Sequence, residues 1–396
     1  MHPTNCLSAF PVWLDGRNWL PGGTGIHSFT HALNETLASR NIPTAILLDR
    51  DSSKPHSITT NLRKFCNAMI GRLPAIRDTS HGDIIIDDLY RTAHTRFRLR
   101  GQISEFDVAN AATPPKVVHW TSPLPIQARG ALNVVTIHDI IPLTHPNLTG
   151  IDSRRFEDLL GRLFERVDGI TTVSEAVRSE IVSRFGIAPG RIRNLYQPVS
   201  HSALQIEAAR AVQPIVQDGG YICVGRVEAR KNIDRLLEAH ALSHTRRPIT
   251  LIGPDGDDRP ACISRGVTST VRRVKWCEKT QLLRTILGAR ALLFPSLAEG
   301  FGLPIIEAMG LGIPVMTSGV GATAEIAGDA AILVDPENVQ EMAAAIAALD
   351  RDDASGIEAR HRLVSAGYQR AQLFTKEAFA EKVIGFYREL ASACGI

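Results

Sequence analysis

The chain has 396 residues, of which 44% are hydrophobic and 21% charged, a globular composition that excludes a disordered tail or a fibrous repeat. This length allows two domains with large buried cores. Lys and Arg number 44 and Asp and Glu 41, so the formal net charge of +3 is too small to indicate a nucleic-acid-binding protein.

The first half of the chain contains short apolar runs that are typical of buried strands. These runs lie at 44–48, 83–86, 117–120, 134–137 and 169–173. Apolar residues at helical spacing predict helices over 150–166 and 174–185.

Residues 91–104 are poorly periodic and rich in arginine, with Phe97 and Leu99 interleaved. The arginines concerned are Arg91, Arg96, Arg98 and Arg100. This segment is compatible with peripheral contact to anionic lipid at the inner membrane face, and equally with a solvated loop.

The second half alternates apolar runs with helical patterns more regularly. Strand-like runs lie at 221–224, 249–252, 291–294, 313–317 and 331–334. Helical patterns cover 232–244 and 281–287 and begin again at Ile305. Such alternation indicates βαβ units and parallel sheets covered by helices on both faces. With a weakly patterned stretch at 198–218, it predicts an α/β fold of two Rossmann-like domains facing a cleft.

The compartment is indicated by what the sequence lacks. No apolar run approaches the roughly 18–20 residues that span a bilayer. The N-terminal residues show no basic stretch followed by an apolar one, and the six cysteines include no C-x-x-C pair. We therefore expect a cytoplasmic protein with free thiols.

The most informative stretch is S-L-A-E-G-F-G-L-P-I-I-E-A-M, residues 296–309. It follows a predicted strand and enters a helix with Pro304 in its first turn. The amides of Gly300, Phe301, Gly302 and Leu303 would then lie at a helix N-terminus, which suits a phosphate or a polyhydroxyl ligand attached to one. Glu299 and Glu307 flank this loop and can accept hydrogen bonds from vicinal hydroxyls. Taken alone, the E-x7-E spacing fits a solvated surface turn equally well.

In its context, S-x-x-E-G-F-G-L-P-x-x-E-A-M-x-x-G-x-P-V, this stretch resembles the donor-site signature of family 4 of the retaining, GT-B-fold glycosyltransferases. The resemblance extends to Y-I-C-V-G-R-V-E-A-R-K-N-I-D at 221–234 and to 325–336. In the first half it is confined to the Gly22–Gly25 loop, 136–139 and 172–175. Within the family, the pattern is most similar to bacterial mannosyltransferase-like enzymes of surface-polysaccharide assembly.

The resemblance implies a GT-B fold with an acceptor-binding domain at 1–212, a donor-binding domain at 213–396, and a last helix that returns to the first domain. It assigns the leaving diphosphate to Arg226 and Lys231, and cations of these two types suit that charge. Glu299 would hold hydroxyls of the donor sugar and Glu307 the ribose diol.

The resemblance also gives a role to the first domain. His138 and Asp139 would orient the reacting centre from across the cleft. Gly23 and Gly25, in the G-G-x-G loop, would join the donor-binding residues, as would Gly300, Phe301, Gly302 and Leu303.

Two departures from the family pattern stand out. Lys275-Trp276 occupies the place where relatives usually have a glycine before an aromatic residue, near the nucleotide base. Tyr196 to Val199 replaces a glycine-containing turn at the domain junction, which favours a stiffer hinge.

These features predict a retaining transferase that moves a hexose, with mannose from GDP-mannose favoured, to a glycan or lipid-linked glycan in bacterial polysaccharide synthesis. We expect no metal and no cofactor. Three D-x-D matches, at 49–51, 255–257 and 350–352, could hold a divalent metal, but they are unrelated to one another and none is diagnostic.

Two other functions remain open on the sequence. One is a nicotinamide-dependent oxidoreductase that uses the Gly22–Gly25 loop, although this loop lacks a clean G-x-G-x-x-G. The other is a non-catalytic glycan-binding protein with the same fold.

Overall fold

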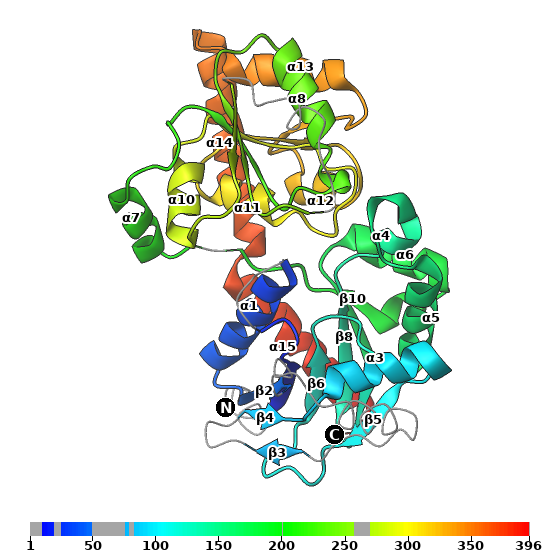
Figure 1. Ribbon diagram of the computed structural model, residues 1–396. Helices are drawn as coiled ribbons and strands as arrows, with labels where there is room; N and C mark the ends of the chain where they lie inside the picture. Colours follow the sequence, from blue (N-terminus) through cyan, green and yellow to red (C-terminus); the bar gives the residue numbers. More distant parts are fainter. Residues whose placement is uncertain are drawn as a thin grey trace, which may run out of the picture.

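The computed structural model (Figure 1) describes residues 10–19, 25–49, 76–78, 83–199, 201–256 and 270–395. It has two lobes, each built on a largely parallel sheet with helices around it. The predicted α/β architecture is therefore confirmed. No helix in these ranges is both long enough and apolar enough to cross a membrane.

The sheet of the first lobe has eight strands in the order β10-β9-β8-β6-β1-β2-β4-β3, and among them only β3 runs antiparallel to its neighbour. Its strands are β1 (Val12–Asp15), β2 (Thr44–Leu48), β3 (Arg77–Asp78), β4 (Ile84–Ile85), β6 (Val117–Trp120), β8 (Leu132–Ile137), β9 (Gly169–Thr172) and β10 (Ile192–Asn194). A separate pair is formed by β5 (Ser104–Asp107) and β7 (Ile126–Arg129). The helices are α1 (Gly25–Ser39), α3 (Leu89–Arg100), α4 (Ile141–Thr144), α5 (Ser153–Phe164) and α6 (Glu175–Phe185).

The second lobe contains six parallel strands in the order β13-β12-β11-β14-β15-β16. They are β11 (Tyr221–Val224), β12 (Ile249–Ile252), β13 (Val271–Val274), β14 (Ala291–Phe294), β15 (Val315–Ser318) and β16 (Ile332–Val334). The helices are α7 (Ala203–Ala211), α8 (Ile233–Leu242), α10 (Lys279–Leu287), α11 (Leu303–Gly310), α12 (Gly321–Ala327), α13 (Val339–Asp350) and α14 (Ala354–Ala371). Four of these strands, β11, β12, β14 and β15, are buried along their whole length, which explains their continuous apolar sequences.

One local prediction is wrong. Residues 91–104 do not form a solvated loop, because most of them belong to α3. Leu89 and Ala93, one turn apart, are both buried, so a single narrow apolar face anchors a helix that is otherwise basic. The helix ends at Gly101, whose φ of 63° is the left-handed conformation that glycine adopts easily. The predicted break at 198–218 likewise contains a helix, α7.

The C-terminal helix α15 (Lys376–Ala393) returns to the first lobe, as predicted. Figure 1 shows it beside α1 in the lower lobe, whereas α14 lies in the upper one. Lys376 pairs with Glu35 of α1 at 2.6 Å, and Arg193 of β10 pairs with Glu389 at 2.5 Å. The two segments that join the lobes also touch, because the Val199 amide donates to the Phe374 carbonyl at 2.8 Å.

A buried polar chain fastens α15 to the first sheet. The Tyr387 hydroxyl lies 2.5 Å from His119 Nδ1, and His119 Nε2 lies 2.7 Å from the Thr136 hydroxyl, which in turn lies 2.7 Å from that of Thr171. Burial lowers the pKa of His119 to about 3. The ring is therefore neutral, so one of its two nitrogens donates a hydrogen bond in this chain and the other accepts one.

We expect Tyr387→Phe to lower the free energy of unfolding by about 1–3 kcal/mol, because it leaves the buried His119 Nδ1 without its hydrogen-bond partner. Urea unfolding measures this difference. Tyr368→Phe is the matched control, since Tyr368 is 47% exposed on α14 and should change the stability little. Equal losses in both variants would show that the buried chain contributes nothing specific.

Candidate functional site

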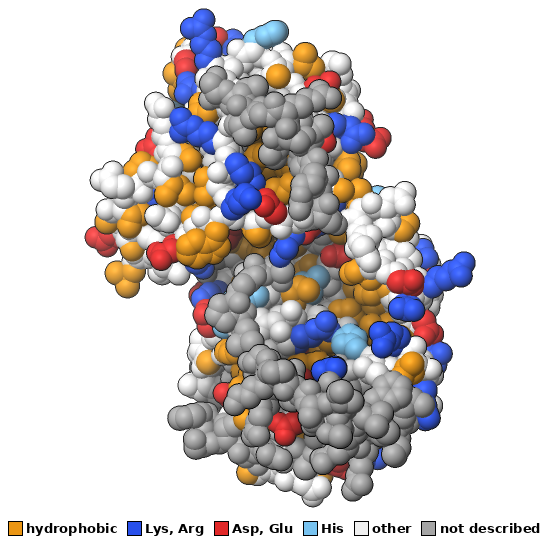
Figure 2. Space-filling view, in the orientation of Figure 1, with side chains coloured by type: hydrophobic (Ala, Val, Ile, Leu, Met, Phe, Trp, Pro, Cys, Tyr) orange, Lys and Arg blue, Asp and Glu red, His pale blue; other side chains and the backbone are white. Residues whose placement is uncertain are grey.

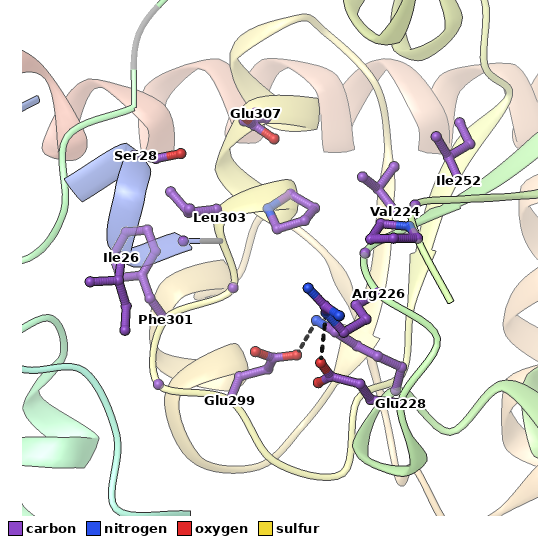
Figure 3. A pocket seen from close by; sticks show the side chains of 18 of the residues that line it. Ile26, Ser28, Val224, Arg226, Glu228, Ile252, Glu299, Phe301, Leu303 and Glu307 are labelled. Carbon is purple, nitrogen blue, oxygen red and sulfur yellow. Dashed lines mark hydrogen bonds and ion pairs between the residues drawn. The ribbon is translucent and has the colours of Figure 1, made fainter. Parts of the chain in front are cut away.

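The two lobes enclose a cavity of about 730 Å³. Figure 2 shows the hollow between the lobes from outside, and Figure 3 shows the side chains that line it. Most of its walls come from loops that follow the carboxyl ends of β8, β11, β12, β13 and β14, the position where parallel α/β sheets bind ligands. Residues from both halves of the sequence therefore meet in one place.

The predicted residues of the second half all line this cavity. Arg226 follows β11, Lys231 ends a short 3-10 helix at Ala229–Lys231, and Glu299 lies on the loop after β14. The remaining members of this set are Gly300, Phe301, Gly302, Leu303 and Glu307.

The loop before α11 has the geometry that its sequence indicates. Gly302 has a φ of 95°, and Pro304 occupies the first turn, where no amide hydrogen is needed. Gly302, Leu303 and Pro304 line the cavity, so the positive end of the helix dipole lies at its wall. Glu307 lies one turn further along α11, and burial raises the pKa of its carboxyl group.

Glu299 lies at the centre of a charged cluster. Its carboxylate pairs with Lys231 and, at 2.5 Å, with Arg230, and its side chain is only 9% exposed. Burial alone would raise the pKa of Glu299, but Lys231 and Arg230 outweigh that effect and lower it. Glu299 is therefore ionised at neutral pH, with its two oxygens fixed by two cations.

Sequence reasoning missed two members of this cluster, Arg230 and Glu228. Glu228 pairs with Arg230 at 2.7 Å and with Arg226 at 3.3 Å. Burial would lower the pKa of Arg230, yet the carboxylates of Glu299 and Glu228 raise it. The sequence R-V-E-A-R-K could have indicated both residues, because acidic and basic residues alternate within its six positions.

The first lobe contributes His138 and Asp139, which directly follow β8 and line the same cavity. His138 Nε2 lies 2.9 Å from the Thr121 carbonyl oxygen, and burial lowers the pKa of this imidazole to about 4. The carboxylate of Asp139 accepts the Ile141 amide at 3.1 Å. Burial raises the pKa of Asp139, an effect that Arg230 across the cleft opposes.

The two lobes approach each other closely at Gly300. A Cβ atom there would lie 1.9 Å from the His138 carbonyl oxygen, a distance that no side chain permits. Gly25 makes a looser contact of the same kind, since a Cβ atom on it would lie 3.5 Å from Leu303. Gly25 also lines the cavity, whereas Gly23 lies outside the described residues.

Most of the D-x-D carboxylates that the structure describes have arginine partners, whereas Asp49 accepts the backbone amides of Asp88 and Tyr90. Asp352 pairs with Arg247 at 2.7 Å and with Arg290 at 2.6 Å, and Asp255 pairs with Arg273 at 3.2 Å. Asp51 and Asp257 lie outside the described residues. Over the ranges that the structure covers, no three His, Cys, Asp or Glu side chains are grouped as a metal site.

The comparisons with known proteins agree with this geometry. Residues 23–202 match the family described as Glycosyltransferase Family 4, and residues 205–370 match Glycosyl transferases group 1. The O-antigen chain mannosyltransferase B of Escherichia coli is 31% identical over 65% of this chain and 70% of its own length. The MMP alpha-(1->4)-mannosyltransferase of Mycolicibacterium hassiacum is 25% identical over 74% and 72%, respectively.

Solved structures support the fold. A sucrose-phosphate synthase from Thermosynechococcus elongatus superimposes with a TM-score of 0.68 at 18% identity, covering 97% of this chain and 100% of that one. An Anabaena protein, HepE, solved with UDP and glucose, gives 0.66 at 15% identity, covering 96% and 100%. The two-lobed architecture is thus the predicted GT-B fold.

The chain belongs to family 4 of the glycosyltransferases, the group 1 glycosyl transferases, and is therefore an enzyme of the glycosyltransferase class. The family match covers the Gly22–Gly25 loop almost entirely, so the oxidoreductase alternative is not favoured.

We expect Gly300→Ala to lower the rate of glycosyl transfer by about 100-fold, because displacement of a reacting group by about an ångström can cost that much. Gly310→Ala is the control. It lies at the end of the same helix, and its Cβ atom would meet only Ala371, at 3.8 Å. Initial rates measure the effect, and thermal unfolding verifies that both variants fold. Wild-type rates for Gly300→Ala would contradict the close approach of the lobes.

Proposed function

We propose that this enzyme transfers mannose from GDP-mannose, with retention of configuration, to a glycan or lipid-linked glycan of a bacterial surface polysaccharide. The main support is the cavity, where Glu299 and its cations lie opposite His138 from the other lobe. The mannose assignment is supported by relatives that are named as mannosyltransferases. Scattered cysteines, three of them free where described, support a cytoplasmic site of action.

In this proposal residues 213–396 bind the donor and residues 1–212 the acceptor. Arg226 is 42% exposed and has one ion pair to a described residue, Glu228 at 3.3 Å, so its guanidinium is available to the donor diphosphate. The amides before α11 and Lys231 would contact the same diphosphate. Glu307 would accept the ribose diol and Glu299 the hydroxyls of the sugar.

The nucleobase would lie at the rim formed by Lys275, Trp276 and Cys277, which follow β13 and line the cavity. Trp276 is 75% exposed there, so its ring is open to stacking by a planar ligand.

The proposed reaction needs stabilisation of the negative charge that grows on the leaving diphosphate. In this proposal Arg226, Lys231 and the helix amides would stabilise this charge without rearranging, which is electrostatic preorganisation. His138 and Asp139 would orient the sugar from the opposite wall. The acceptor hydroxyl would attack the face from which the diphosphate leaves, so the configuration at the anomeric carbon is retained.

The decisive experiment is a panel of nucleotide sugars with the purified enzyme. We expect GDP-mannose to raise the melting temperature and to support transfer, because a ligand that binds only the native state stabilises it. NMR of the product should show an α-linked mannose, and EDTA should leave the rate unchanged. A β-linked product would exclude retention, and a loss restored by manganese would exclude the metal-free mechanism.

Separate roles for the two glutamates predict separate effects. Glu307→Gln should weaken binding of free GDP by about 10- to 150-fold, the equivalent of roughly 1.5–3 kcal/mol for a hydrogen bond to a charged group. Glu299→Gln should leave that affinity nearly unchanged and lower turnover with the full donor. Calorimetry with GDP and initial rates measure both. Equal effects on GDP binding would contradict this division.

We also propose that α3 rests on an anionic membrane surface. Arg91, Arg98 and Arg100 are exposed on it without an ion pair to any described residue, and Leu99 is 45% exposed beside them. Figure 2 shows basic side chains gathered over the part of the lower lobe where Figure 1 places α3 and its neighbours.

A vesicle flotation assay tests this contact. With about 1 kcal/mol per basic residue near such a surface, the pair of substitutions R98Q and R100Q should weaken binding to anionic vesicles about 30-fold. The control pair R272Q and R362Q, exposed on the second lobe, should change it little. Equal binding to neutral vesicles would contradict an electrostatic contact.

A further inference from the structure

The proposed reaction does not use Asp15, a carboxyl group buried at the end of the central strand β1. One of its oxygens, Oδ2, accepts both donors of Thr121: the backbone amide and, at 2.7 Å, the side-chain hydroxyl. Thr121 follows the neighbouring strand β6. A buried carboxyl group is costly unless its hydrogen bonds are satisfied, so this arrangement calls for a reason.

Thr121 connects Asp15 to the cavity. Its carbonyl oxygen lies 2.9 Å from Nε2 of His138. A carbonyl oxygen only accepts hydrogen bonds, so Nε2 carries the proton. Because burial lowers the pKa of His138 to about 4, the ring is neutral at physiological pH and Nδ1 keeps its lone pair. The carbonyl oxygen of Thr121 thus selects the Nε2–H tautomer of His138.

Helix α1 supports the same two residues. The ring of Phe29 packs edge-on against His138, with ring centres 5.0 Å apart and an interplanar angle of 89°. The hydroxyl of Thr30, the next residue, lies 2.9 Å from that of Thr121. The plane of the imidazole is therefore set by Phe29 on one side and by the carbonyl of Thr121 at its edge.

We propose that Asp15 is a positioning residue for the transfer reaction. By fixing both donors of Thr121, it holds the Thr121 carbonyl against Nε2 of His138 and so presents Nδ1 to the cavity as an acceptor for a hydroxyl of the bound sugar. This inference rests on the proposed function, in which His138 contacts that sugar.

The first measurement is the effect of Asp15→Ala on turnover. We expect kcat to fall about 10-fold, within the range known for a misplaced catalytic group, while the affinity for free GDP stays unchanged because the second lobe binds it. Asp15→Asn keeps an oxygen that can accept from Thr121 and should restore most of kcat. If Asp15→Ala fails to fold, Asp15→Ser, which cannot satisfy both donors, replaces it.

A control is available at the amino ends of the strands in the same sheet. Asp168, which precedes β9, is exposed but also accepts a backbone amide, that of Asn133 at 2.7 Å, and it does not line the cavity. Asp168→Ala should affect stability without changing kcat. A similar loss of kcat in both aspartate variants would overturn the proposal.

A double-mutant cycle shows whether Asp15 acts through His138. In a His138→Ala background, Asp15→Ala should lower kcat no further, because the group that it positions is already gone. A further loss of kcat in that background would refute the positioning role of Asp15 and leave the proposed function untouched. If His138→Ala by itself leaves kcat unchanged, the proposed role of His138 fails first.

The tautomer gives a readout that does not depend on activity. In enzyme with 15N-labelled histidine, the His138 signals are identified among the 13 histidines as those lost in His138→Ala. We expect a single Nε2–H tautomer in the wild type and a mixture of tautomers in Asp15→Ala. An unchanged tautomer in Asp15→Ala would overturn the proposal.

Discussion

The active site depends on how closely two backbones can approach. The loop that begins α11 reaches the carbonyl of His138 from the other lobe, and only a residue without a side chain fits at position 300. This contact brings the carboxyl ends of the two parallel sheets together. The chemistry open to the cavity depends on this contact, because neither sheet alone would present cations, carboxylates and an imidazole to one ligand.

The charged side chains near that contact neutralise one another in pairs. Glu299 tolerates burial because Lys231 and Arg230 bind its two oxygens, and Arg230 in turn is held by Glu228. A polar ligand entering here exchanges water for groups that are already oriented, which is the condition under which electrostatic stabilisation is most effective. Arg226 is the more open member of this group, with a side chain that is 42% exposed.

The arrangement of the lobes is maintained away from the cavity. Helix α15 crosses back and is bound to the first sheet by the chain from Tyr387 through His119 to Thr136. On the other side, the carboxylate of Glu325 on α12 accepts the amides of Glu175 and Ala176 at the start of α6. These contacts restrict how far the lobes can separate, and the two crossing segments also pack against each other at Tyr196 and Phe374.

The sequence by itself determined the fold class, the alternation of strands and helices in the second half, and the loop at 299–303 that begins α11, because these depend on local periodicity and on short motifs. It failed for α3, whose single narrow apolar face is too weak a signal among its arginines. It also could not find Arg230, Glu228 or the link from Asp15 to His138. Those roles depend on the order of the strands in each sheet and on how the two lobes pack against each other. Such contacts join residues 68 to 106 positions apart, as in Lys231 with Glu299 and Asp15 with Thr121, and only tertiary packing brings them together.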